Sequence, residues 1–204
     1  MTIQSLNSRI FYDTFVAATA YFERHIDAIN DLNVFPVPDG DTGTNMYQTL
    51  SGMKNRVTYV DTYSVQHLSK LFSEAALWEG RGNSGIILSQ IFKGIYLGLK
   101  DKDLTTVNIV SSSLECAFNS AYSSIANPTE GTILTVLRDI AEESGRQIRT
   151  ERTFSELLAA LSIKAKESVD STPSHLELLR DAGVVDSGAY GLEIFLRGIH
   201  IHIS

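Results

Sequence analysis

The chain has 204 residues, of which 43% are hydrophobic and 20% charged, a size and balance that suit one compact domain or at most two small ones. Its formal net charge of −7, without any run of Lys and Arg, argues against nucleic acid as a partner, because phosphate backbones attract basic surfaces. The single cysteine excludes an internal disulfide and a zinc cluster of thiolates, and no apolar run approaches the roughly 18 residues of a membrane span, so we expect a cytoplasmic protein.

Apolar residues recur at helical spacing along almost the whole chain, and no run of alternating β-branched residues predicts a strand. We therefore predict an all-α fold with eight or nine helices. The first apolar stripe runs from Leu6 to Ile29 as one helical segment and ends in the loop 33–43, where two prolines stop a helix. A second helix is expected to begin near Thr44.

The later part of the chain carries further apolar stripes at the same spacing. They predict helices over residues 64–78, 86–99, 107–125, 133–140, 157–165, 175–180 and 192–199. Phe72 and Trp78 are both expected in the core. Thr153 and Glu156 have the spacing of a capping box, which begins a helix. The proline-containing segment 171–174 is expected to end that helix before the next, short one.

Four polar loops that contain glycine each lead into an apolar helix. They cover residues 38–45, 81–85, 128–132 and 185–188. A helix N-terminus offers unpaired backbone N–H groups and the positive end of the helix dipole, so several such ends brought together would bind phosphates. Each loop taken alone is explained equally well as an ordinary cap or turn.

The first of these loops holds two aspartates, Asp39 and Asp41, on either side of Gly40. Two carboxylates at this spacing can face the same hard cation, and Mg²⁺ prefers one or two carboxylates together with waters and phosphate oxygens. The loop therefore predicts a site where Mg²⁺ and a polyphosphate bind together.

Competing motifs fail at identifiable positions. A calcium EF-hand beginning at Asp39 needs glycine and glutamate where Thr44 and Leu50 stand, and no Gly-Lys-Ser/Thr triplet forms a Walker A loop. Residues 80–85 match the dinucleotide fingerprint by letter, but that fingerprint follows a β-strand and this segment follows a predicted helix. Arg81 borders the same loop, and both a functional and a solvated role stay open for it.

Four blocks in order, Leu32–Met46, Arg81–Gln90, Glu130–Thr135 and Gly183–Gly188, closely resemble the N-terminal, DhaL-type domain of the bacterial fatty acid kinase catalytic subunit. That domain is related to the ADP-binding subunit of dihydroxyacetone kinases. The resemblance spans nearly the whole chain, so residues 1–204 are expected to form a single nucleotide-binding domain that is a fragment of a longer, multidomain protein.

The resemblance implies a barrel of about eight antiparallel helices whose loops at one end bind ATP or ADP and two Mg²⁺ ions. By match of motif, Asp39 and Asp41 are the metal ligands and act in catalysis through the metal. The positions implied to line the phosphates are Thr42, Thr44, Asn45, Asn83, Ser84 and Gly85. The positions implied to close the site around the rest of the nucleotide are Gly131, Thr132, Asp186, Ser187 and Gly188.

Two positions separate the branches of this family. Dihydroxyacetone kinases carry a third aspartate upstream and a histidine after the second aspartate of the pair, whereas the nearest counterparts here are Asn33 and Thr42. Asn33 offers an uncharged oxygen to a metal. The pattern favours the fatty acid branch, which implies transfer of the γ-phosphoryl group of ATP to the carboxylate of a fatty acid, giving an acyl phosphate for phospholipid synthesis.

In that branch the fatty acid is presented by a separate fatty-acid-binding carrier protein. The carrier and the remaining domains of the full-length kinase are thus the implied partners, and the isolated domain is expected to turn over poorly. Two alternatives stay open. One is a kinase subunit for a small hydroxyketone such as dihydroxyacetone, and the other is a non-catalytic helical interaction module that is stabilised by a metal.

Overall fold

The computed structural model describes residues 6–102, 106–148 and 153–204. Within these ranges the chain forms ten helices and no β-strand, which confirms the predicted all-α class. Two helices are short, α2 (Ile26–Asn30) and α9 (Glu177–Ala182). The eight long ones are α1 (Ser8–Glu23), α3 (Thr42–Arg56), α4 (Val65–Glu79), α5 (Gly82–Leu99), α6 (Val107–Ser123), α7 (Ile133–Gln147), α8 (Phe154–His175) and α10 (Ser187–Ile203).

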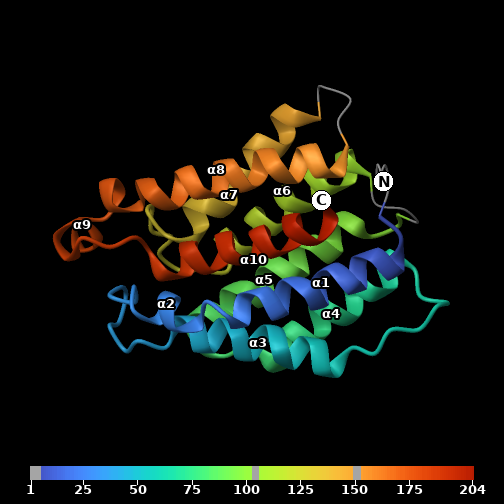
Figure 1. The fold of residues 1–204 in the computed structure, drawn as a ribbon, viewed down its shortest axis with the longest axis horizontal. Helices are drawn as coiled ribbons and strands as arrows, with labels where there is room; N and C mark the ends of the chain where they lie inside the picture. Colours follow the sequence, from blue (N-terminus) through green and yellow to red (C-terminus); the bar gives the residue numbers. More distant parts are fainter. Residues whose placement is uncertain (1–5, 103–105, 149–152) are drawn as a thin grey trace.

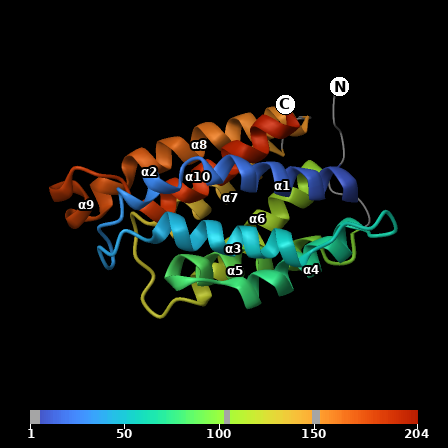
Figure 2. The same ribbon diagram turned by 60° about the horizontal axis from the view of Figure 1, so that its bottom comes forward.

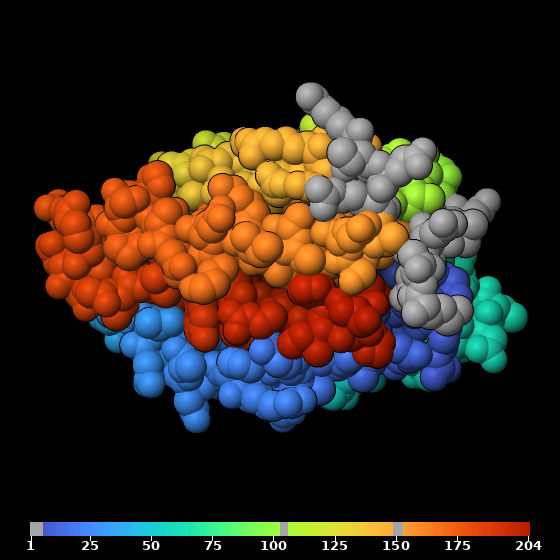
Figure 3. All heavy atoms as spheres, turned by 45° about the horizontal axis from the view of Figure 1, so that its top comes forward, coloured from blue at the N-terminus to red at the C-terminus, as the bar shows by residue number. Residues whose placement is uncertain are grey.

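The long helices form a closed barrel. Each packs against two neighbours, in the order α1, α10, α8, α7, α6, α5, α4, α3 and back to α1. Neighbours in this ring run in opposite directions (Figures 1 and 2). On the face drawn in Figure 3, α8, α10 and α1 lie side by side, and α9 projects beyond one end of the barrel. The alternation places the N-termini of α3, α5, α7 and α10 at that same end.

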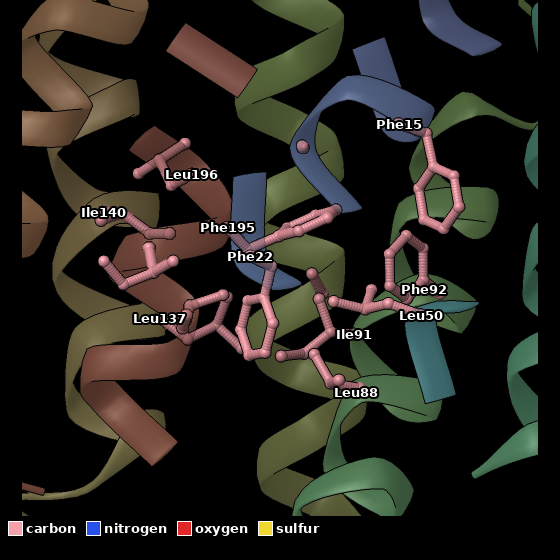
Figure 4. Close-up of a cluster of buried hydrophobic side chains, with 14 of the residues drawn as sticks. Phe15, Phe22, Leu50, Leu88, Ile91, Phe92, Leu137, Ile140, Phe195 and Leu196 are labelled. Carbon is pink, nitrogen blue, oxygen red and sulfur yellow. The ribbon is translucent and has the colours of Figure 1, made fainter. Parts of the chain in front are cut away.

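The inside of the barrel is filled by large apolar side chains from opposing helices, as Figure 4 shows. The side chains that meet there include Phe15, Phe22, Leu50, Leu88, Ile91, Phe92, Leu137, Ile140, Phe195 and Leu196. Each long helix thus buries the apolar stripe that its sequence periodicity predicts. None of the described helices is long and apolar enough to cross a membrane.

The first predicted helix is wrong in its length, because it divides into α1 and α2 at Arg24 and His25. The backbone N–H of His25 donates to the carbonyl of Phe22, three residues back, at 2.9 Å. The imidazole Nδ1 of His25 lies 2.9 Å from the carbonyl oxygen of Tyr21, which an unbroken helix would pair with the His25 N–H. The side chain therefore replaces a helical hydrogen bond and allows the chain to turn.

The predicted break at residues 171–174 is also wrong, since α8 continues through Pro173 to His175. A proline inside a helix leaves the carbonyl four residues earlier without its N–H donor. Here that carbonyl belongs to Val169, and the Thr172 hydroxyl donates to it at 2.7 Å. One side-chain hydrogen bond thus compensates for the missing backbone donor.

Trp78 corrects a third expectation, because its side chain is 72% exposed, whereas Phe72 is buried as expected. The two residues are six positions apart on α4, which separates them by about 120° around a helix with 3.6 residues per turn and places Trp78 outside the buried stripe.

Candidate functional site

A pocket of about 410 Å³ opens at the barrel end where the four long helices begin. Residues from all four predicted loops line it: Thr42, Asn83, Ser84, Thr132, Asp186, Ser187 and Gly188. The rest of the wall is mostly apolar and includes Phe35, Pro36, Ile86, Ile87, Ile125, Ile133 and Leu134. The helix N-termini therefore do converge on one space, which has the size and the mixed lining of a small-molecule site.

The start of α3 is held by two asparagines from the segment before it. The Asn33 side-chain oxygen accepts hydrogen bonds from the Asp41 N–H at 3.1 Å, the Thr42 N–H at 3.1 Å and the Thr42 hydroxyl at 2.8 Å. The Asn33 amide donates to the carbonyl of Val37 at 3.0 Å. A residue considered above as a metal ligand thus has its oxygen occupied by three donors, and it shapes the aspartate loop.

Asn30 holds the next residue of the same helix end. Its side-chain oxygen accepts the Thr44 N–H at 3.1 Å, and its amide donates to the Thr44 hydroxyl at 3.0 Å. Because the asparagines satisfy these groups, the Asp41 side chain makes no capping hydrogen bond although Asp41 is the N-cap residue. Within the described part of the chain neither Asp39 nor Asp41 forms an ion pair, so both carboxylates are available to a cation.

The start of α5 is built differently. Gly82 adopts a left-handed φ of +57°, and a Cβ there would lie 2.4 Å from the Asn45 amide nitrogen, so Asn45 packs directly over this turn. The N-cap residue, Arg81, makes no side-chain capping bond. Among the described residues, no acceptor faces the backbone N–H groups of Gly82, Asn83 and Ser84. These are the open amide groups that an anion can bind.

Arg81 is the cation nearest to these open amides in sequence. Its guanidinium is largely exposed and lies 3.9 Å from a carboxylate oxygen of Glu79, at the outer limit of an ion pair. The other Glu79 oxygen pairs more closely with Arg56, at 2.7 Å. Glu79 therefore restrains Arg81 only weakly, and the Arg81 side chain is free to turn toward a bound anion.

The third loop is braced from α7. Thr132 caps that helix by accepting the Leu134 N–H, and Gly131 has a left-handed φ of +80°. The Gly131 N–H donates to the Thr135 hydroxyl at 2.8 Å, and this hydroxyl donates to Glu130 at 2.8 Å. Arg138 completes the brace through a 2.6 Å hydrogen bond to Glu130.

The fourth loop places a carboxylate in the pocket wall. Asp186 is buried, caps α10 by accepting the Ala189 N–H at 2.8 Å, and donates its own N–H to Thr172 at 3.0 Å. Burial raises the pKa of this carboxyl from 3.8 to about 6, while hydrogen bonds from the N–H groups of Ala189, Ile133 and Gly188 act in the opposite direction. The carboxylate thus links the starts of α7 and α10.

The remaining predicted positions lie around the pocket rather than in its wall. Gly85 is buried beneath the α5 turn, Asp39 is exposed on its loop, Asp41 is the N-cap of α3, and Thr44 and Asn45 lie in the first turn of that helix. No cluster of three or more His, Cys, Asp or Glu side chains that could hold a metal occurs in the described ranges. Two carboxylates remain, which suits a cation whose other ligands are waters and phosphate oxygens.

Sequence reasoning missed two groups of residues at this site. The apolar wall residues Phe35, Ile86, Ile87 and Ile125 are one group, and the organising Asn30 is the other. The apolar residues flank the polar loops in the sequence, and that position was the signal available. Asn30 gives no such signal, because its partner Thr44 lies 14 residues later in the chain.

Comparison with known proteins agrees with this architecture. The family model of the DAK2 domain matches residues 36–200. Uncharacterized protein SAB1090 of Staphylococcus aureus is 36% identical over 190 residues, which are 93% of this chain and 35% of that protein. A protein of Staphylococcus epidermidis is 37% identical over 201 residues, covering 97% of this chain and 36% of its own length.

Two crystal structures of the dihydroxyacetone kinase of C. freundii share the fold. The native form aligns with a TM-score of 0.66 at 17% identity, over 98% of this chain and 35% of that one. The complex with AMP-PNP and Mg²⁺ aligns with a TM-score of 0.68 at the same identity and coverage. The chain therefore spans about a third of the length of these relatives and solved chains. Since the family model covers most of its residues, the chain belongs to the DAK2 domain family.

Proposed function

We propose that this chain binds ATP or ADP together with Mg²⁺ and serves as the nucleotide-binding domain of a phosphotransferase. The observation that carries the proposal is the convergence of four helix starts on one pocket, beside a loop with two unpaired carboxylates. Membership of the DAK2 family and the fold shared with a kinase crystallised with AMP-PNP and Mg²⁺ support it.

The starts of α3 and α5 contribute different groups to binding. The N–H groups of Asp41, Thr42 and Thr44 are occupied by asparagines, so α3 contributes carboxylate charge rather than open amides. The α5 start contributes open amides and no carboxylate. In the proposal Asp39 and Asp41 hold Mg²⁺, which neutralises charge on the phosphates, while the amides of α5 receive the phosphate oxygens.

The apolar half of the pocket suits the base. Ile86, Ile87, Ile125 and Phe35 form a wall that can cover a planar ring, and apolar walls with a few polar groups are typical of small-molecule sites. In the proposal the nucleotide therefore lies with its phosphates toward α3 and α5 and its base toward this wall, and Thr132, Ser187 and Gly188 close the far side.

For the finer assignment we propose a fatty acid carboxylate as the phosphoryl acceptor, presented by a separate fatty-acid-binding protein. Asp186 is the one titratable residue in the described pocket wall, and its oxygens receive backbone N–H groups. A hydroxyl acceptor needs a base to take its proton, whereas a carboxylate is already ionised at neutral pH. A carboxylate acceptor therefore requires no base, and its phosphorylation depends on positioning and charge neutralisation.

Calorimetric titration with ADP tests the nucleotide site. We expect binding that depends on Mg²⁺ and is weakened at least about 100-fold in the Asp39→Ala, Asp41→Ala double variant, since both metal ligands are gone. Asp61→Ala is the matched control, because Asp61 is an exposed aspartate before α4, at the other end of the barrel. Equal binding with and without Mg²⁺ would contradict the proposal.

Two further measurements separate the alternatives. Formation of acyl phosphate from ATP and a carrier-bound fatty acid would support the carboxylate acceptor, whereas phosphorylation of dihydroxyacetone without any carrier would support the hydroxyketone kinase. A melting temperature that Mg²⁺ raises and that ADP leaves unchanged would instead indicate a metal-stabilised interaction module.

A further inference from the structure

Thr49 lies on α3, two turns after the aspartate loop, and its side chain is completely buried. Its hydroxyl donates to the carbonyl of Asn45 at 2.8 Å and accepts the backbone N–H of Arg81 at 3.1 Å. A hydroxyl has one donor and two acceptor sites, so both bonds form at once. This single group connects the helix of the aspartates to the loop that begins α5.

Gly85 strengthens this connection by its lack of a side chain. A Cβ at Gly85 would lie 2.4 Å from the Thr49 hydroxyl oxygen and 3.1 Å from the carbonyl carbon of Gly80. The first turn of α5 therefore rests directly on the hydroxyl. This contact and the contact of Asn45 over Gly82 together fix the position of the α5 start relative to α3.

We propose that Thr49 is a positioning residue, whose hydroxyl holds the open amides of α5 in register with the aspartate loop of α3. The inference rests on the proposed nucleotide site, in which the metal lies on one side of this link and the phosphates lie on the other. A shift of the α5 start changes the distance between the two, and polyphosphate binding to metal and amides together depends on that distance.

The α1 residue Thr19 provides a matched control. It is also completely buried, and its hydroxyl donates to the carbonyl four residues earlier, that of Phe15, at 2.9 Å. It makes no hydrogen bond to another helix in the described structure. Thr19→Val and Thr49→Val therefore remove the same local bond, and only the second removes the link to Arg81. Thr49→Ser keeps the hydroxyl and serves as the rescue variant.

The first measurement is amide hydrogen exchange in the protein without nucleotide. We expect exchange of the Arg81 amide to be about tenfold faster or more in Thr49→Val, with wild-type rates in Thr49→Ser and Thr19→Val. Unchanged exchange at Arg81 in Thr49→Val would overturn the proposal. This result is independent of nucleotide, so it stands even if the wild-type protein fails to bind ADP.

The second measurement is ADP affinity with and without Mg²⁺. We expect Thr49→Val to weaken Mg²⁺-dependent binding about tenfold and metal-free binding clearly less, because the link aligns metal with phosphate. Equal weakening in both conditions, or the same loss in Thr19→Val, would show a general structural effect and would overturn the positioning role. Failure of the wild-type protein to bind ADP with Mg²⁺ would instead count against the proposed nucleotide site.

Discussion

The starts of α3 and α5 contact each other although α4 lies between the two helices in the ring, and they are built in opposite ways. At α3 the first N–H groups are taken up by the side chains of Asn30 and Asn33, and the N-cap carboxylate of Asp41 makes no capping bond. At α5 the N-cap side chain makes no capping bond, and among the described residues no hydrogen-bond acceptor is found for its first backbone amides.

This difference determines which ion each helix start can receive. When neutral asparagine oxygens occupy the amides of α3, the carboxylates beside them are released for a cation. When the amides of α5 stay open, that start attracts an anion. The same local element, a helix start after a glycine loop, thus provides sites for opposite charges, depending on whether a neighbouring side chain caps it.

The largest expected effect comes from removing the asparagine that caps α3. Asn33→Ala leaves two backbone N–H groups and one hydroxyl without their acceptor, and we expect a loss of about 4 kcal/mol in the free energy of unfolding. The matched control is Asn7→Ala, since Asn7 caps α1 through one bond to the Ile10 N–H in an exposed setting. We expect that change to cost about 1 kcal/mol. Urea unfolding measures both, and equal losses would refute the special role of Asn33.

A second test concerns the buried carboxylate of Asp186 at the start of α10. Its pKa is raised from 3.8 to about 6, so the folded state disfavours ionisation, and this group's contribution to stability falls as the pH rises through about 4 to 6. Asp186→Asn cannot ionise. We therefore expect the free energy of unfolding of the variant to gain about 3 kcal/mol relative to wild type between about pH 4 and pH 7.

The pH profile is measured by urea unfolding at several pH values, with Asp61→Asn as the control. Asp61 is exposed, so its substitution should change the wild-type profile little. A difference between Asp186→Asn and wild type that stays constant with pH would show that burial does not penalise this carboxylate.

The smallest expected effect concerns the open turn at the start of α5. Gly82→Ala introduces a Cβ 2.4 Å from the Asn45 side chain at a φ of +57°, and Gly183→Ala has a similar φ of +68° with no atom within 4 Å. Both should lower the free energy of unfolding by about 1 to 1.5 kcal/mol through backbone strain. Calorimetry should show weaker ADP binding in Gly82→Ala alone, and equal affinities would mean that the turn needs no close contact with Asn45.

Most of the fold could be predicted from the sequence, because the buried face of each amphipathic helix appears in the sequence as apolar residues at helical spacing. The capping box at Thr153 and Glu156 is one example, and the structure contains it. The errors lie where a single side chain overrides a local rule. His25 ends a helix that the apolar stripe continues, and Thr172 lets α8 pass through Pro173.

The candidate site was predictable in its polar loops and not in its supports. Glycine and aspartate at a helix start can be recognised in one segment, and residues from all four predicted loops do line one pocket. Thr49 and Asn30 act on segments 32 and 14 residues away, so their roles appear only when the helices are packed. The apolar wall was missed because isoleucines beside a loop are equally well explained as residues of the hydrophobic core.

The alternating directions of the barrel helices have a practical consequence for labelling. Ser8 at the start of α1 and Ile203 at the end of α10 both lie at the end opposite the pocket. Since α10 has 17 residues, a fluorophore attached after it begins about 25 Å from the pocket mouth. Such a reporter leaves the mouth unobstructed and sits at a separation suited to energy transfer from a fluorescent nucleotide, so occupancy becomes readable as a change in emission.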